Sequence, residues 1–392
     1  MNSFVIAITI LLFFFSAARS QNISTTGWQK LVPSESLPQN LKIRSSNNNL
    51  DLIQFNGRFY FAFRTAPTHF ASRKTRIYIL SSADLESWTL EREIHHGCDL
   101  REPRFVQHDG KLLFYFFEGG KSPLRFEPRH VWMMEYHPSA GWQAEKNIGL
   151  DGYVPWRLRT RNDTIFLSAY FGKNIYNSRH QSELRLFIST DGIAWKPLTE
   201  SPQSIAGNSS EGEFIFDKDG CLWATVRLES EGALIACADK SSPGNWHASY
   251  SKYKYDSALM FMQGDDIYVI SRRNVDGTMA KAPKWFPKNL RKKYNLLKYW
   301  LTTKKTALFR LDKSAMQLTH VLDFPSTGDT AFPAMAQLDE NRYLLMNYSS
   351  NIRDRNRNWL AGQLGKTYIY WTILKFDKPE AEMSSLPAAT PE

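Results

Sequence analysis

Six short turns recur along the chain, each flanked by two runs in which apolar and polar residues alternate. The turns QFNGRF, QHDGKL, TRNDTI, DKDGCL, MQGDDI and LDENRY centre on Gly57, Gly110, Asp163, Gly220, Asp265 and Asn341. A period of two predicts β-strands, and Asn-Gly or Asp-Gly pairs favour the positive φ angles of tight hairpin turns. The pattern therefore predicts six β-hairpins.

Tryptophans mark a second turn in four of these repeats. Trp88, Trp142, Trp195 and Trp246 follow one another at intervals of 54, 53 and 51 residues. Two of them end the matching sequences SADLESW (residues 82–88) and STDGIAW (189–195). We expect the Asp of this S-x-D-x-x-x-W pattern to accept hydrogen bonds from turn amides, and the Trp to pack into the sheet.

One repeat thus contains an inner and an outer hairpin, which is four strands in about 50 residues and the content of a propeller blade. The predicted fold is all-β, a six-bladed propeller of four-stranded antiparallel blades. The sixth repeat lacks a Trp turn after its strand TYIYWTILKF (367–376). We expect GWQKL (27–31) to pair there and close the ring, which protects the edge strands.

The ends of the chain predict export. Residues 4–15 are almost wholly apolar, and the small residues Ala18 and Ser20 follow, so residues 1–20 are interpreted as a signal peptide of a protein secreted to the extracellular space or periplasm. The rival interpretation is a membrane anchor, but roughly 12 apolar residues fall short of the ~20 that a spanning helix needs. Residues 21–376 would form the propeller and 377–392 a disordered tail.

Charge is concentrated in one insertion, which lengthens blade five over about residues 277–305 and contains a predicted short helix within 285–300. The net charge is +10, and residues 277–310 contain many Lys and Arg but no Asp or Glu. Either this segment is simply a solvated insertion, or residues 281–305 contact an anionic glycan or membrane surface. No nucleic-acid partner is expected.

Few signals point to other chemistry. The sequence has no phosphate-binding glycine loop or dinucleotide fingerprint, and its His and Cys residues lack metal-ligand spacing, so neither a cofactor nor a metal is implied. Of the three cysteines, Cys221 and Cys237 fall on neighbouring predicted strands. They either pair or remain buried thiols.

The open ends of the inner hairpins are predicted to converge on the propeller axis. Counting from each turn, positions nine before and seven after the central residue should face each other. This pairs Asn48 with Arg64, Arg101 with Phe117, Val154 with Tyr170, Glu211 with Arg227, Asp256 with Arg272, and Phe332 with Tyr348. Neighbouring positions add Asp51, Glu102, Arg104, Trp156, Arg157, Glu213, Glu229, Arg273 and Asp329.

Arginines, carboxylates and aromatic rings together suit an acidic sugar, because guanidinium binds carboxylate in a bidentate manner and aromatic faces stack on sugar rings. The alternative is that Glu211–Arg227 and Asp256–Arg272 are only cross-strand ion pairs.

These residues resemble the sialidase superfamily, and its bacterial-type group in particular. The sequence at 189–195 is similar to the family's Asp-box, S-x-D-x-G-x-x-W, with one residue fewer before the Gly. The segment EGEFIF (211–216), followed by Arg227, resembles the part of the family that carries a catalytic glutamate and a carboxylate-binding arginine. The resemblance implies three arginines that hold the substrate carboxylate, a Tyr nucleophile assisted by Glu, and an Asp acid/base.

Two positions depart from that pattern. Asn47 and Asn48 stand where the first arginine is expected, and Phe332 stands where the nucleophilic Tyr is expected. Arg64 or Arg104 would replace the first arginine, Arg272 or Arg273 would be the third, and Tyr348 would supply a displaced hydroxyl. The predicted catalytic residues are Glu211, Asp256 and Tyr348. The predicted substrate-binding residues are Arg64, Arg101, Arg104, Arg157, Arg227, Arg272, Trp156 and Tyr170.

Three functions remain open at this stage. The first is a glycoside hydrolase or lyase that pairs Glu211 with Glu102, Asp256 or Asp329, with a raised pKa on one carboxyl and an ionised partner. The second is a glycan-binding propeller without catalysis. The third is a protein-interaction scaffold that uses the basic insertion. A glycoside hydrolase with an atypical catalytic set is the working prediction.

Overall fold

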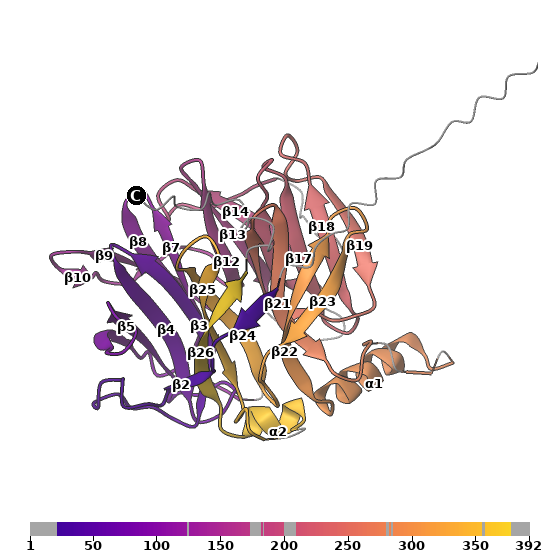
Figure 1. Ribbon diagram of the computed structural model, residues 1–392, viewed down its shortest axis with the longest axis horizontal. Helices are drawn as coiled ribbons and strands as arrows, with labels where there is room; N and C mark the ends of the chain where they lie inside the picture. The colour runs from indigo at the N-terminus through magenta and orange to yellow at the C-terminus, as the bar shows by residue number, and fades with distance from the viewer. Residues whose placement is uncertain are drawn as a thin grey trace, which may run out of the picture.

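The computed structural model describes residues 22–377 apart from 124, 173–181, 183, 200–208, 280–281, 284 and 355–356. The predicted signal peptide and all but the first residue of the predicted tail lie outside the described residues. Six antiparallel sheets stand around a central axis (Figure 1). The prediction of an all-β six-bladed propeller is confirmed.

The blades are numbered in chain order, and the strands of each blade are given from the axis outwards. Blade one contains β3 (Ser46–Phe55), β4 (Arg58–Ala66), β5 (Arg76–Ser82) and β6 (Thr89–Ile94). Blade two contains β7 (Asp99–His108), β8 (Lys111–Gly120), β9 (Val131–His137), β10 (Gly141–Trp142) and β11 (Lys146–Asn147). Blade three contains β12 (Tyr153–Arg161), β13 (Thr164–Phe171), β14 (Leu184–Ser189) and β15 (Lys196–Pro197).

The second half of the ring repeats this order. Blade four contains β16 (Ser209–Phe216), β17 (Leu222–Leu228), β18 (Ala233–Ala238) and β19 (Trp246–Ser251). Blade five contains β20 (Asp256–Gln263), β21 (Asp266–Asn274), β22 (Lys304–Asp312) and β23 (Gln317–Asp323), with helix α1 (Lys288–Trp300) between β21 and β22. Blade six contains β24 (Thr330–Gln337), β25 (Arg342–Ser349) and β26 (Tyr368–Phe376), with helix α2 (Trp359–Leu364) before β26.

The N-terminal segment closes the ring as predicted. Strands β1 (Ile23–Thr25) and β2 (Gln29–Val32) both pair antiparallel with β26 and complete blade six. The outer edge of that blade is therefore covered by chain from the opposite end of the sequence, which leaves fewer unpaired backbone groups exposed there.

A β-bulge interrupts every inner hairpin near its open end. The register shifts fall between Asn48 and Leu50, Arg101 and Arg104, Pro155 and Arg157, Ser209 and Gly212, Asp256 and Leu259, and Ala331 and Ala334. A bulge inserts one unpaired residue and redirects the side chains beside it. The bulges thereby turn towards the axis polar side chains that the regular alternation along a strand would point elsewhere.

The register prediction is confirmed in four blades and wrong in blades four and six. Asn48 faces Arg64, Arg101 faces Phe117, Val154 faces Tyr170 and Asp256 faces Arg272. Glu211 lies within its bulge, but its carboxylate forms an ion pair with Arg227. In blade six Tyr348 faces Ala331 instead of Phe332, because Ala331 and Phe332 both take positive φ angles, 98° and 63°.

The two matching Trp turns have the predicted hydrogen bonds. Asp84 Oδ1 accepts from the amides of Glu86 and Ser87 at 2.9 Å, and Asp191 Oδ1 accepts from those of Ile193 and Ala194 at 2.8 Å. Trp88 is buried in the main apolar cluster between the blades. These turns therefore fix the outer hairpins and lie away from the axis.

Helices α1 and α2 lie at one end of the propeller (Figure 1). They contact each other through Tyr299 and Trp359, which form a small apolar cluster with Met279. No described helix is both long and apolar enough to cross a membrane. Cys98, Cys221 and Cys237 are all free thiols.

Candidate functional site

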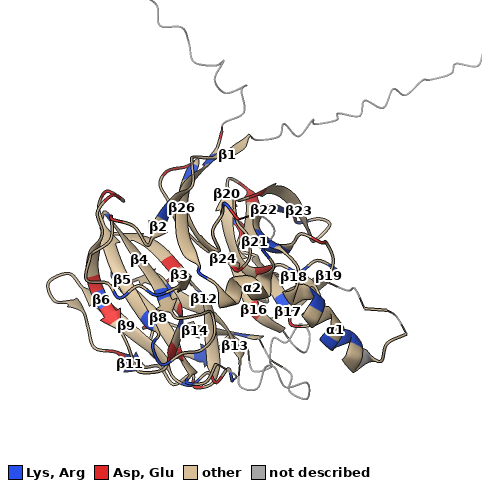
Figure 2. Cartoon of the chain, turned by 90° about the horizontal axis from the view of Figure 1, so that it is seen from below, with Lys and Arg blue, Asp and Glu red and all other residues tan. Residues whose placement is uncertain are grey.

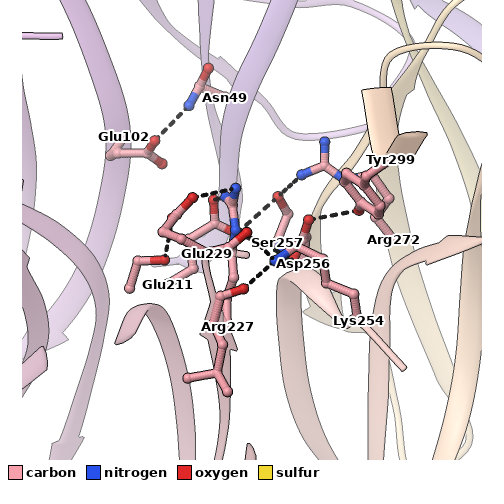
Figure 3. A network of polar contacts seen from close by, with 12 residues as sticks. Asn49, Glu102, Glu211, Arg227, Glu229, Lys254, Asp256, Ser257, Arg272 and Tyr299 are labelled. Atoms are coloured by element: carbon pink, nitrogen blue, oxygen red, sulfur yellow. Dashed lines mark hydrogen bonds and ion pairs between the residues drawn. The ribbon is translucent and has the colours of Figure 1, made fainter. Parts of the chain in front are cut away.

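Blades four and five bring an ion-paired group of side chains to the axis (Figure 3). The group lies at the end of the propeller that carries the helices, because Tyr299 of α1 contacts Asp256. Arg227 on β17 forms an ion pair with Glu211 on β16 and lies 3.2 Å from Glu229 and 3.4 Å from Asp256. Glu211 also accepts a 2.8 Å hydrogen bond from the backbone amide of Ser257. The bulges in β16 and β20 place these residues opposite each other across the two blades.

Asp256 is held ionised in this group. Burial opposes its charge, but attraction from Arg227, Lys254 and Arg272 outweighs burial and lowers the pKa of Asp256 to about 2. The hydroxyl of Tyr299, at the C-terminal end of α1, donates to Asp256 Oδ2 at 2.7 Å. The basic insertion thus reaches the axis, and Asp256 is a fixed anion that orients the surrounding cations.

Glu102 on β7 has a raised pKa, in contrast to Asp256. It is 5% exposed, and its carboxyl accepts from Asn49 at 2.8 Å and from Arg104 at 3.2 Å. Burial and repulsion from Glu211 outweigh the attraction of Arg104 and raise the pKa of Glu102 to about 7. A carboxyl that keeps its proton near neutral pH beside a carboxylate is the arrangement that general acid catalysis requires.

Burial opposes the charge of Arg272 on β21, but attraction from neighbouring acidic side chains, Asp256 among them, outweighs burial and raises the pKa of Arg272. It is 3% exposed, donates to Ser257 Oγ at 2.9 Å, and lies 4.6 Å from the ring centroid of Trp359 on α2. Among the residues that the structure describes, no carboxylate forms an ion pair with it, and its Nε has no hydrogen-bond partner. A buried guanidinium without an ion pair favours binding of an anionic group.

Tyr348 lies deeper, in a network around Asp329. The Tyr348 hydroxyl and the Trp359 indole both donate to Asp329 Oδ1 at 3.0 Å, and His69 Nδ1 lies 2.7 Å from Oδ2. Burial and the Asp329 charge raise the pKa of Tyr348 well above its usual value. The phenol is therefore held protonated, and the shared contacts of Asp329 with Tyr348, Trp359 and His69 connect α2 to blades six and one.

Arg64 and Arg101 share one buried counter-ion. Asp99 lies 2.6 Å from Arg64 and 2.5 Å from Arg101, and both Arg64 and Asp99 are fully buried. Arg101 also donates to the carbonyl of His69 at 2.6 Å. These two predicted substrate-binding residues join blades one and two, and their role in binding stays a prediction.

Arg104 and Arg157 lie further along the axis. Arg157 lies 2.5 Å from Glu213, and Arg104 donates to the carbonyl of Trp156 at 2.5 Å. The Trp156 ring lies 5.4 Å from the Arg104 guanidinium and 5.0 Å from the ring of Phe332. Beyond them, towards the hairpin turns, a cavity of about 450 Å³ opens; it is lined by Ile53, Gln107, Thr160, Arg161 and Phe216 among others.

We call Glu102, Glu211, Arg227, Asp256, Arg272 and Asp329 the rim site. Of the other predicted residues, Tyr348 borders the rim site, whereas Tyr170 is buried among apolar side chains. Sequence reasoning did not select His69, Lys254, Tyr299 or Trp359, because they come from connections and insertions outside the hairpin register. The described residues contain no cluster of three or more His, Cys, Asp or Glu side chains suited to a metal ion.

No protein-family model matches the sequence, and no curated protein matches it. Solved structures do match in fold. A protein of unknown function from Dyadobacter fermentans is 14% identical with a TM-score of 0.61, over 91% of this chain and 99% of that one.

Two enzymes are also similar in fold. Trypanosoma rangeli sialidase is 10% identical with a TM-score of 0.62, over 90% of this chain and 60% of its own length. The endosialidase of phage phi92 is 10% identical with a TM-score of 0.56, over 87% and 68%. The chain therefore has a sialidase-like six-bladed propeller fold.

Proposed function

We propose that the protein is exported, binds a carboxylated sugar at the rim site and cleaves the glycosidic bond of that sugar. The observation that carries this proposal is that two carboxyl groups at the axis have different environments. Glu102 has a pKa of about 7, whereas Glu211 forms an ion pair with Arg227. In this mechanism Arg272 and Arg227 bind the sugar carboxylate. Glu102 protonates the leaving oxygen, and Glu211 stabilises positive charge at the anomeric carbon or activates water.

The sialidase-like fold supports the choice of an acidic sugar, and sialic acid is the first substrate to test. The chain departs from the expected sialidase pattern at Phe332, which has no hydroxyl. The proposed mechanism accordingly uses carboxyl groups and assigns no covalent step to a tyrosine.

A glycan-binding protein without catalysis is the second candidate. Arg227 already forms ion pairs with Glu211, Glu229 and Asp256, and this network would suit a rigid binding site. Under this alternative Arg272 would still bind the carboxylate, but no product would form.

The test is a panel of sialylated, uronic-acid and neutral glycans, followed by product release and by ligand-induced thermal stabilisation. We expect Glu102→Gln to abolish product release while retaining ligand-induced stabilisation. We expect Arg272→Met to lower both the rate of product release and the affinity obtained from stabilisation by about tenfold or more. Glu93→Gln and Arg310→Met, on outer strands of blades one and five, are the matched controls. Stabilisation without product in the unmodified protein would favour the binding-only function, and neither signal with any acidic glycan would refute the proposal.

A further inference from the structure

Helix α1 presents an apolar stripe to solvent. Leu290 and Leu297 are 47% and 53% exposed and stand seven residues apart, which places them on one face two turns apart. Leu301, at the end of the helix, continues this face and is 49% exposed. Two large aromatic side chains flank the helix in sequence: Trp285, three residues before it, is 80% exposed, and Trp300, its last residue, is 42% exposed.

The opposite face of α1 is the one that packs on the propeller. Tyr299 is 2% exposed and Leu296 is partly buried, and both belong to the cluster with Trp359 of α2. The exposed stripe therefore does not result from a detached helix, because α1 is already anchored by its other side. Large apolar side chains on an anchored outer face indicate a contact with something outside the chain.

Cations flank the stripe on both sides. At 100° per residue, Lys293 lies on one side of the line from Leu290 to Leu297, and Arg291 and Lys298 lie on the other. No Asp or Glu occurs anywhere in residues 277–310, and α1 carries only basic charge in Figure 2. An exposed apolar stripe bordered by Lys and Arg, with Trp at its ends, is the pattern of a helix that lies in a bilayer interface.

We propose that α1 docks the protein on the surface of an anionic lipid bilayer. The leucine stripe with Trp285 and Trp300 enters the boundary between headgroups and acyl chains, and the flanking cations contact lipid phosphates. A second copy of the chain fits less well, because a symmetric contact would bring like charges from the two α1 helices together. A sulfated polysaccharide would use the cations but leave the leucine stripe in water.

Docking would also set the orientation of the molecule. Tyr299 of α1 bonds to Asp256, and Trp359 of the adjacent α2 lies against Arg272. The end of the propeller that holds the rim site would thus face the bilayer and its glycoconjugates. This consequence rests on the proposed function, whereas lipid binding itself does not.

Flotation of the protein with vesicles tests the proposal. Vesicles of phosphatidylcholine alone are compared with an equal mixture of phosphatidylcholine and phosphatidylglycerol. We expect binding to the anionic vesicles only. The variant Leu290→Ser/Leu297→Ser should weaken it roughly tenfold or more. Lys293→Gln/Lys298→Gln should weaken it about fivefold for each lysine removed.

Tyr250→Ser, 54% exposed on β19, and Lys218→Gln, 63% exposed at a hairpin turn, are the matched controls and should float like the unmodified protein. Failure to float, equal flotation of the leucine variant, or equal binding to neutral vesicles would overturn the proposal. Retention on heparin without flotation would indicate a polysaccharide partner. A concentration-dependent dimer that does not form in the leucine variant would indicate that a second copy of the chain binds α1. Because flotation requires no glycan, its failure leaves the rim-site proposal independently testable.

Discussion

The protonation of Glu102 has a consequence for stability that can be measured without knowing any substrate. Its pKa rises from an ordinary value of 4.5 to about 7 on folding. A group whose folded pKa is raised binds its proton more tightly in the native state, so stability falls as pH rises between about 4.5 and about 7 and then levels off. At about 1.4 kcal/mol for each pH unit, the full loss is about 3 kcal/mol.

Glu102→Gln removes this ionisation and keeps an amide oxygen that can accept from Asn49. Urea unfolding, followed by tryptophan fluorescence at about pH 5 and about pH 8, measures the effect in both proteins. We expect the unfolding free energy of the variant minus that of the unmodified protein to be about 2–3 kcal/mol more positive at about pH 8 than at about pH 5. Any constant cost of placing the amide beside Arg104 cancels between the two pH values. An equal difference at both pH values would refute the raised pKa and with it the assignment of Glu102 as the acid.

Three further predictions test the surrounding structure. Asp99→Ala leaves the buried Arg64 and the partly buried Arg101 without their counter-ion and should lower the unfolding free energy by about 3–5 kcal/mol, measured in urea; a loss below about 1 kcal/mol would contradict the buried ion pair. Gly362→Ala would place a Cβ 2.0 Å from the backbone nitrogen of Asp329, so we expect a loss of about 1–3 kcal/mol and weaker ligand-induced stabilisation; unchanged melting would show that α2 is not packed there. In a hydrolysis assay, kcat/KM should fall as pH rises through about 7 because Glu102 loses its proton, and a flat profile across that range would exclude Glu102.

The repeat architecture is predictable from the sequence because it depends on local signals. Hairpin turns need residues that tolerate positive φ, and the period of four strands repeats often enough to count blades. Counting from the turns also locates Arg64, Glu211, Arg227, Asp256 and Arg272 at the axis. It fails at Phe332, where a bulge takes two consecutive positive φ angles without a glycine to signal it.

The rest of the rim site depends on tertiary contacts. Tyr299 reaches Asp256 from an insertion, and Trp359 reaches Asp329 from a short helix, so neither has a position in the repeat. The pKa of Glu102 follows from its burial and from repulsion by Glu211, which lies two blades further along the chain. No local sequence pattern encodes either effect. Charge at the axis could thus be predicted from sequence, but the protonation of each group could not.

Recognition of a sugar carboxylate by Arg272 is the central claim, and calorimetric titration tests it most directly. The best acidic ligand from the glycan panel and its methyl ester are titrated into the unmodified protein and into Arg272→Met. We predict that the acid binds at least about tenfold more tightly than the ester, and that Arg272→Met removes this preference. Equal binding of acid and ester, or a preference that survives in Arg272→Met, would contradict it.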